Sequence, residues 1–428
     1  MKKFFTTSML AAAALLTPFF TAGAQTPIST FDELNTIVHA SDFDYSGSYY
    51  LTADIVVPDG HEWVPIGAPS DWPTNTSMIE FAGVFDGKGH SIKNLKITAG
   101  VAFCGFFGKL LNKAVVKNLG LENVNITGGN PVGGLSATMY GNEADMDGSL
   151  EAVTIEKVFV TGSVKGIGHV GGIVGRCNNN PTNILSNCYS NCDVEVTEAA
   201  SPDAIAGGIV GCMKSGRGLK ISNCYAAGTV KKTNDAFYTG GILGGVANSN
   251  ANANTTFTLE NSAVVLSEIG ASPSDLFFTT TAAFKGVTIL SNNYARNDLG
   301  LTASWAGCAV REPSAFLDQP FYEYTLGWDF TDVWEMEDGV SYPTLKFSNT
   351  TTINNAATGK PAYTISATVG GLDVVSAKSL SLKIYDMTGR TLAVKQVSGY
   401  ARIPAPKGLY LVQASCGNSV NVQKMTVK

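Results

Sequence analysis

The sequence predicts an all-β protein: a right-handed β-solenoid (β-helix) with a short N-terminal capping helix and a small C-terminal β-sandwich. The 428 residues include 46 glycines and only 15% charged residues. This composition suits short strands joined by tight turns, because glycine adopts backbone angles that other residues resist. Two sequence patterns also recur in phase along the chain, which is typical of a repeat architecture.

The first pattern is a glycine-rich segment that combines one or two glycines with apolar residues and usually ends in glycine. Equivalent positions in its five copies are 29, 38, 36 and 33 residues apart. The copies lie at residues 105–108, 133–135, 171–175, 207–211 and 240–244.

The second pattern is an apolar residue, one variable residue, usually Asn, and then a small or apolar residue. Asn tolerates the left-handed region and bonds backbone groups at turns, so it suits the corner of a coil. Stacked corners would lie about 4.8 Å apart, which allows an amide ladder. The predicted corners are Asn94, Asn118, Lys157, Asn187, Asn223, Asn261 and Asn292. The residues after them form a predicted interior column: Leu95, Leu119, Val158, Cys188, Cys224, Ser262 and Asn293.

The chain divides into six predicted segments. They are a signal peptide (1–24), an N-terminal cap with the first strands (25–77), the solenoid (78–300), its C-terminal cap (301–348), a linker (349–360) and a β-sandwich for sorting or attachment (361–428).

The first segment has the features of an export signal. Lys2 and Lys3 precede an apolar run, and small residues at Ala22 and Ala24 suit cleavage after Ala24. No later stretch approaches the roughly 20 apolar residues that a membrane span needs. The formal charge of −6 argues against a nucleic-acid partner.

Local patterns support the two ends of this division. Thr30 and Glu33 have the spacing of a helix capping box, and Phe31, Leu34, Ile37 and Val38 recur on one helical face. Near the C-terminus, residues 380–385 alternate like a strand, residues 386–390 supply a turn, and residues 408–412 and 420–427 give further strands.

The Gly-Gly-Ile-Val-Gly copies resemble the GLUG motif of bacterial surface and adhesin-like proteins. Residues 50–55, 63–67 and 81–90 resemble that family's entry segments, and residues 326–345 its closing segment. The resemblance implies a β-helix used in adhesion or surface display, and it brings no catalytic residues. The Ile-Tyr-Asp-Met-Thr-Gly-Arg and Gly-Leu-Tyr segments of the tail resemble C-terminal sorting domains of type IX secretion. The resemblance implies a signal for export and for attachment at the outer membrane, with its cleavage left open.

The cysteines and histidines give no predicted site. Cys188 and Cys224 fall in the interior column, so we expect small buried side chains there. Cys177 and Cys212 follow equivalent glycine segments and could lie within bonding reach on adjacent coils, although we favour free thiols. The histidines are His39, His61, His90 and His169, and no spacing brings two of them to one metal.

Two loops resemble binding sites but favour structural interpretations. The acidic run at 143–148 has Thr154 where a calcium loop needs its bidentate Glu, so a solvated loop is the preferred interpretation. Residues 86–90, Asp-Gly-Lys-Gly-His, lack a following helix and a Walker pattern, so a tight β-turn is favoured over a phosphate site.

Aromatic residues are the remaining candidates for binding. Exposed rings could stack on a sugar or on a protein partner, although aromatic residues more often fill cores. Tyr189, Tyr225 and Tyr294 recur in phase and predict an outward stacked column. The separate candidates are Tyr49, Tyr50, Trp63, Trp72 and Trp305.

The sequence therefore predicts a non-enzymatic surface protein, an adhesin or scaffold that contacts glycans or host or matrix proteins, with no cofactor, metal or catalytic residue. It would be secreted and retained at the bacterial cell surface. One alternative is a carbohydrate-active enzyme, a lyase or glycoside hydrolase, on the same fold; it requires a carboxylate pair from unlike coils. Another is a structural subunit of a surface assembly.

Overall fold

A computed structural model describes residues 25–111, 113–140, 152–178, 182–197, 204–214, 218–233, 238–247, 256–270, 274–280, 287–301, 305–347, 363–368, 371–385, 391–416 and 419–427. The chain forms two compact units, residues 1–348 and 349–428. The predicted signal peptide and linker lie outside the described residues. No helix among the residues described is long and apolar enough to cross a bilayer.

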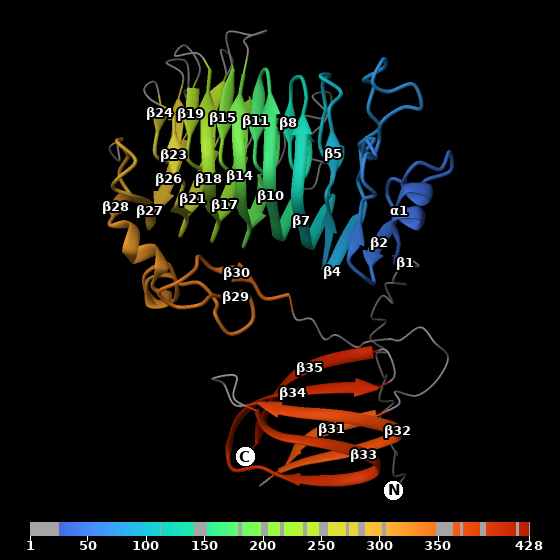
Figure 1. The fold of residues 1–428 in the computed structure, drawn as a ribbon. Coiled ribbons are helices and arrows are strands. Elements are labelled where there is room, and N and C mark those ends of the chain that lie inside the picture. The colour runs from blue at the N-terminus through green and yellow to red at the C-terminus, as the bar shows by residue number, and fades with distance from the viewer. Residues whose placement is uncertain are drawn as a thin grey trace, which may run out of the picture. The chain divides into compact units, whose positions relative to one another are not determined.

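The first unit is a stack of parallel strands in three sheets, here called the parallel stack (Figure 1). Within the described residues, sheet A has 17 strands, sheet B six and sheet C five. Within each repeat the chain passes from sheet A to sheet C, then to sheet B, and returns to sheet A. The mostly β fold agrees with the all-β prediction, and its parallel sheets fit a β-helix.

The strand bounds follow the predicted repeat. Sheet A contains β1 (Gln25–Ile28), β2 (Ser48–Leu51), β3 (Ile55–Val56), β4 (Val84–Lys93), β5 (Lys96–Ile97), β7 (Val115–Thr127), β10 (Thr154–Gly166), β13 (Asn183–Ser186), β14 (Tyr189–Val196), β17 (Gly218–Ser222), β18 (Tyr225–Lys232), β21 (Thr256–Glu260), β22 (Ala263–Val264), β23 (Glu268–Ile269), β26 (Val287–Ser291), β27 (Asn293–Arg296) and β28 (Cys308–Arg311). Sheet B contains β6 (Phe107–Leu111), β9 (Ser136–Tyr140), β12 (Val174–Cys177), β16 (Val210–Lys214), β20 (Leu243–Ala247) and β25 (Phe278–Thr280). Sheet C contains β8 (Val132–Gly133), β11 (His169–Gly171), β15 (Ile205–Gly207), β19 (Tyr238–Gly240) and β24 (Ser274–Asp275).

All seven predicted corners have left-handed backbone angles, with φ between 50° and 63°. Side-chain amides join corners of adjacent coils: Asn223 Nδ2 donates to Asn187 Oδ1 at 3.3 Å, and Asn292 Nδ2 donates to Asn261 Oδ1 at 2.9 Å. The predicted amide ladder is therefore present in pairs.

The predicted register is wrong at Asn94. This residue stacks on Asn123, whose Nδ2 donates to Asn94 Oδ1 at 2.9 Å. The partner of Asn118 is Asp86, whose Oδ1 accepts from Asn118 Nδ2 at 2.9 Å. The cause is the turn at residues 86–90, which interrupts the pairing of β4 with β7 and places a second corner later in the first coil.

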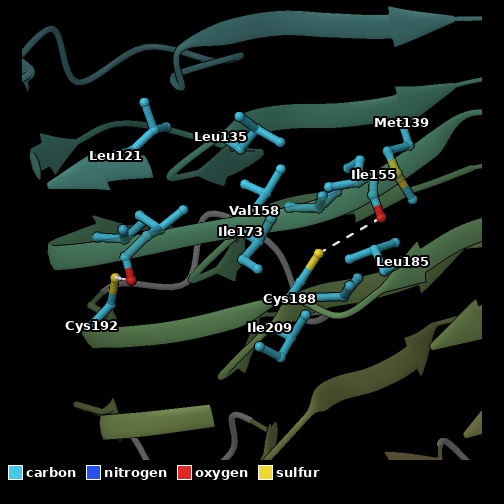
Figure 2. Close-up of a cluster of buried hydrophobic side chains, with 14 of the residues drawn as sticks. Leu121, Leu135, Met139, Ile155, Val158, Ile173, Leu185, Cys188, Cys192 and Ile209 are labelled. Carbon is cyan, nitrogen blue, oxygen red and sulfur yellow. Dashed lines mark hydrogen bonds between the residues drawn. The ribbon is translucent and has the colours of Figure 1, made fainter. Parts of the chain in front are cut away.

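The interior of the stack is a continuous apolar core (Figure 2). In β10, alternate residues such as Val158 and Val160 point inward because side chains of a strand alternate between its faces. Cys188 and Cys192 join this core, and their Sγ atoms donate to backbone oxygens of the neighbouring coil (Figure 2). Every member of the predicted interior column is at most 1% exposed, Leu95 included, although Leu95 belongs to a different corner.

Sheets B and C pack against each other through glycine. Gly208 lies in the turn between these two sheets, where a Cβ atom would lie 2.2 Å from the carbonyl oxygen of Gly241 in the next coil and 2.5 Å from Cβ of Ala226 in sheet A. A Cβ atom on Gly171 would lie 2.0 Å from the oxygen of Val174. The repeated glycines are therefore required by close backbone approach, and this explains the first sequence pattern.

The predicted N-terminal helix is confirmed as α1 (Phe31–Val38). Thr30 Oγ1 accepts from the Glu33 N–H, and Glu33 Oε2 accepts from the Thr30 N–H, which completes the capping box. Leu34 and Val38 are buried in the core of the stack. This amphipathic face explains how a helix of only two turns is stable here.

A segment at residues 313–347, here called the lateral segment, lies along several coils of the stack (Figure 1). It contains a 3₁₀ turn (Pro313–Leu317), a π turn (Phe321–Thr325) and a short antiparallel pair, β29 (Trp334–Glu335) with β30 (Thr344–Leu345). Trp328 Nε1 donates to Asn261 O at 2.8 Å, and Phe347 stacks on Phe159 at 5.6 Å between ring centroids. The segment thereby reaches coils that are about 100 residues apart in sequence.

The second unit is one connected antiparallel sheet of five strands: β31 (Tyr363–Thr368), β32 (Gly371–Tyr385), β33 (Thr391–Pro404), β34 (Gly408–Cys416) and β35 (Ser419–Val427). The predicted strands are present. Hydrogen bonds connect the five described strands through β32, which pairs with β31 along one half and with β34 along the other. The unit encloses an apolar core of its own, in which Leu372, Val374 and Leu382 are fully buried. The predicted turn at residues 386–390 lies outside the described residues.

Gly208→Ala is expected to lower the free energy of unfolding of the first unit by about 1–3 kcal/mol, because the added methyl would overlap backbone and Ala226. Gly270→Ala is the matched control, with an expected change below about 1 kcal/mol: its nearest neighbours are the side chains of Thr239 and Lys232, the latter flexible. All five tryptophans lie in the first unit, so urea denaturation followed by tryptophan fluorescence measures its unfolding. Equal stability of the two variants would contradict the packing argument.

Candidate functional site

The clearest cluster of titratable side chains lies on the outer face of the first coils. Asp54 accepts from His90 Nδ1 and from Lys93 Nζ, each at 3.2 Å. Lys93 Nζ also lies 3.2 Å from Glu122. These side chains are one quarter to one half exposed, so the cluster faces solvent.

The electrostatics of this cluster disfavour the glycosidase alternative there. Burial of the Asp54 carboxyl opposes its ionisation, but hydrogen bonds from the Ser91 N–H, Lys93 and His90 outweigh burial and lower its pKa. Burial likewise opposes the charge on Lys93, but contacts with Asp54 and Glu122 raise its pKa. A glycosidase acid needs a carboxyl whose pKa is raised. Asp54 is instead a carboxylate held ionised within a network of paired charges.

The turn at residues 86–90 is structural. Asp86 is 3% exposed, and its Oδ1 accepts from the Lys88 N–H at 2.9 Å as well as from Asn118. Lys88 adopts a left-handed φ of 52°. The carboxylate is thus used to hold the turn, as the sequence interpretation expects. The acidic run at 143–148 lies outside the described residues.

The histidines occupy four different environments. His39 has both ring nitrogens 2.9 Å from backbone oxygens, of Asn35 and Val64. His61 packs edge-on against Phe31, with ring centroids 4.8 Å apart. His90 contacts Asp54, and His169 is buried. Within the described part of the chain, no group of three or more His, Cys, Asp or Glu residues could hold a metal ion.

The prediction of exposed aromatic residues is wrong for most candidates. Trp63 and Tyr49 are buried in the core, where Trp63 stacks on Phe106 at 5.2 Å. Trp72 and Trp305 pack against the same core, and Tyr50 is half-buried. The ends of the stack need apolar covers, and these rings help to provide them.

The predicted tyrosine column is stacked only at Tyr189 and Tyr225, because Ala263 lies in register between Tyr225 and Tyr294, and the stacked part is covered. Tyr189 and Tyr225 lie parallel with ring centroids 4.9 Å apart, and Phe159 extends the column at 5.0 Å. Trp328 and Trp334 of the lateral segment pack over Tyr225, whose hydroxyl donates to Pro343 O at 2.7 Å. The column therefore holds the lateral segment and offers no open binding platform.

The cysteine pair Cys177 and Cys212 does not meet. Cys177 is in register with Met213 and belongs to the interior core, whereas Cys212 is in register with Arg176 and belongs to an outer cluster. Adjacent residues of a strand point to opposite faces, and this separates the two thiols. Cys177 lies two residues after the last glycine of its segment, whereas Cys212 lies one residue after the last glycine of its own. This difference in spacing was the sequence signal that the two thiols face opposite sides.

His169 is the functional candidate that sequence analysis missed. It begins β11, is 3% exposed, and neither Nδ1 nor Nε2 has a hydrogen-bond partner among the residues that the structure describes. Burial, followed by the positive charges of Arg176 and Lys214, lowers the pKa of His169 to about 3. The equivalent residues of the next two coils are Ile205 and Tyr238, so a histidine here breaks an otherwise apolar position.

Comparison by sequence gives two partial relatives, and no family model matches the chain. The chain is 34% identical over 174 residues to halomucin from Haloquadratum walsbyi, which covers 37% of this chain and 2% of halomucin. It is 27% identical over 224 residues to an immunoglobulin A1 protease of Streptococcus sanguinis, which covers 52% of this chain and 11% of that protein. The chain thus matches a small fraction of each relative's length.

Comparison by structure gives a likeness over three quarters of the chain. A crystal structure from Bacteroides ovatus, named "putative immunoglobulin A1 protease", matches with a TM-score of 0.58 and 25% identity. The match covers 75% of this chain and 92% of that one. The names of these relatives are surface-related, which agrees with an extracellular location.

These findings contradict the prediction that the chain is not an enzyme. A sequence relative and a structural neighbour both have the name of a protease, which points to an enzyme. No column of Asp or Glu recurs in phase along the sequence, and the prediction depended partly on that observation. Catalytic groups need no repetition, because a few residues from unlike coils are enough.

His169 is expected to make folding stability depend on pH. The folded chain keeps this ring neutral down to a pKa of about 3, whereas unfolded histidine protonates near pH 6.5. Between these values the unfolded state binds more protons, so stability falls as pH falls. From pH 7 to pH 4.5 the loss due to His169 is about 2–3 kcal/mol.

His169→Gln removes this proton uptake, so the difference in unfolding free energy between pH 7 and pH 4.5 should shrink by that amount. Urea denaturation at both pH values measures it, and His39→Gln, at an exposed ring, is the matched control. An unchanged pH dependence in the His169 variant would show that this ring is not a buried neutral base.

Proposed function

We propose that the chain is exported and works outside the cell as a right-handed β-helix that binds an extracellular glycan or glycoprotein. The observation that supports this most directly is the parallel stack, whose likeness to the Bacteroides ovatus structure covers 92% of that chain. Its core and its glycine contacts are used for folding, which leaves outward side chains and turns to vary for recognition.

The two sequence resemblances are part of this proposal. The glycine copies that pack sheet B on sheet C correspond to the segments that resemble the GLUG motif, so the motif would mark a folding constraint shared by surface proteins. The second unit would be the type IX sorting domain that retains the protein at the outer membrane. Its five antiparallel strands form a unit of their own, as a transferable signal requires.

Immunoglobulin A1 is the first ligand to test. It is named for both a sequence relative and a structural neighbour, although the chain covers only 11% of the former. A segment that corresponds to one part of a protease suits recognition of the substrate, since recognition and cleavage can reside in different parts of a large protein.

Cleavage of the same ligand is the second candidate function, and the protease names favour it. Within the described residues the nearest approach to a hydrolytic constellation is the contact of His90 with Asp54 at 3.2 Å. A carboxylate that orients an imidazole is part of such machinery, but a nucleophile or activated water is also required.

One experiment separates these functions. The chain from residue 25 onward is immobilised and exposed to immunoglobulin A1, to its deglycosylated form and to serum albumin, and the recovered heavy chain is examined by gel electrophoresis. We expect saturable binding of immunoglobulin A1 over albumin. Heavy-chain fragments that disappear in the His90→Gln variant would establish cleavage. If neither binding nor fragments are observed, immunoglobulin A1 is rejected as the ligand. A glycan and matrix-protein array then tests the broader proposal.

A further inference from the structure

Sheets B and C meet along an outer seam where their side chains face each other. Ile205 of β15 and Cys212 of β16 are buried together there, with Tyr238 of β19 packed against them. One coil earlier, His169 is in register with Ile205, and Arg176 is in register with Cys212. His169 and Arg176 therefore occupy the same seam, and they replace an apolar pair with a polar one.

Buried polar atoms without partners gather at this part of the seam. Both ring nitrogens of His169, Thr138 Oγ1 and Asn178 Oδ1 have no hydrogen-bond partner among the described residues. Thr138 is in register with Arg176, and Asn178 lies two residues beyond Arg176 on the same side of its strand. A buried polar group without a hydrogen-bond partner lowers the free energy of unfolding. Such a group either destabilises the fold to no purpose or forms its hydrogen bond with a ligand.

The charged side chains of the described residues that act on His169 are positive. Arg176 and Lys214 both act electrostatically on the His169 ring. Lys214 ends β16, is exposed, and forms no ion pair with the described residues. Lys109 of β6, in register with Thr138, is paired with Glu80 at 3.4 Å. The part of the seam around His169 thus has cations and a hydrogen-bond donor, which are the groups that recognise an anion.

We propose that the seam around His169, Arg176 and Lys214 binds a carboxylate, supplied by an acidic saccharide or by an acidic peptide side chain. Neutral imidazole donates one N–H, which would bond a carboxylate oxygen, and the planar guanidinium of Arg176 would bond the group from the exposed side. The Thr138 hydroxyl can donate or accept, and Asn178 Oδ1 can accept, a further hydrogen bond from neighbouring hydroxyl or amide groups of the ligand. The inference rests on the proposed binding function and names its ligand class.

The test follows the imidazole signals of the four histidines by nuclear magnetic resonance in the protein from residue 25 onward. The probes are N-acetylneuraminate, glucuronate, a short glutamate-containing peptide and neutral N-acetylglucosamine, and His169→Gln assigns the signal. We expect a saturable shift of the His169 signal with at least one acidic probe and none with the neutral sugar. A response to the sugar acids, to the peptide or to both identifies the source of the carboxylate.

Substitutions of the two less buried cations beside His169 test the site without replacing the buried ring itself. Lys214→Met and Arg176→Gln should each weaken binding about tenfold or more. Lys220→Met is the matched control: Lys220 lies on the outer face of sheet A, where it pairs with Glu260 at 2.8 Å, so the variant should bind as the wild type does. No saturable shift, or equal affinity in all three variants, would overturn the inference. If the protein binds a carboxylate but not immunoglobulin A1, then immunoglobulin A1 is rejected as the ligand and the carboxylate site is retained.

Discussion

The close approach of sheets B and C at glycine is the constraint on which the rest of the first unit depends. Where a Cβ atom would lie 2.0–2.5 Å from backbone, as at Gly171 and Gly207, no other residue fits without moving a whole strand. The chain must return to the same place in each coil, because the next coil pairs with it in register. The repeat length therefore varies mainly in the connections between strands, apart from local irregularities within β4 and β7, and pairing resumes in register beyond each of them.

This constraint explains which parts of the fold could be predicted from sequence. Glycine and asparagine are required by local backbone geometry, so their spacing shows the coils and the corners directly. The register of Asn94 could not be found in the same way. Asn94 and Asn118 both follow the corner pattern, and only the turn at residues 86–90, held by Asp86, places them at different corners. Such an offset depends on hydrogen bonds between coils, which a linear pattern does not contain.

The sequence predicted which way side chains point better than it predicted whether they are exposed to solvent. The tyrosine column does point outward from sheet A, as its phase indicates. It is nevertheless buried, because Trp328, Trp334 and Phe347 arrive from a segment more than 100 residues later than Tyr189 and Tyr225. An outward side chain is a binding candidate only if no distant segment covers it, and composition alone does not show this.

A repeat protein offers its own test for function, because most positions are explained by the repeat. A residue that departs from the pattern without a structural gain is a candidate for another role. Asp86 departs from the corner pattern but holds a turn, and the Trp63 ring covers an end of the core, so both departures are explained. His169 is not explained in this way: it replaces an apolar position, its two ring nitrogens have no partner in the described part of the chain, and it lies beside two cations. The same reasoning shows why an acidic column was the wrong criterion for enzymatic function, since a functional site in a repeat is expected where the repeat is broken.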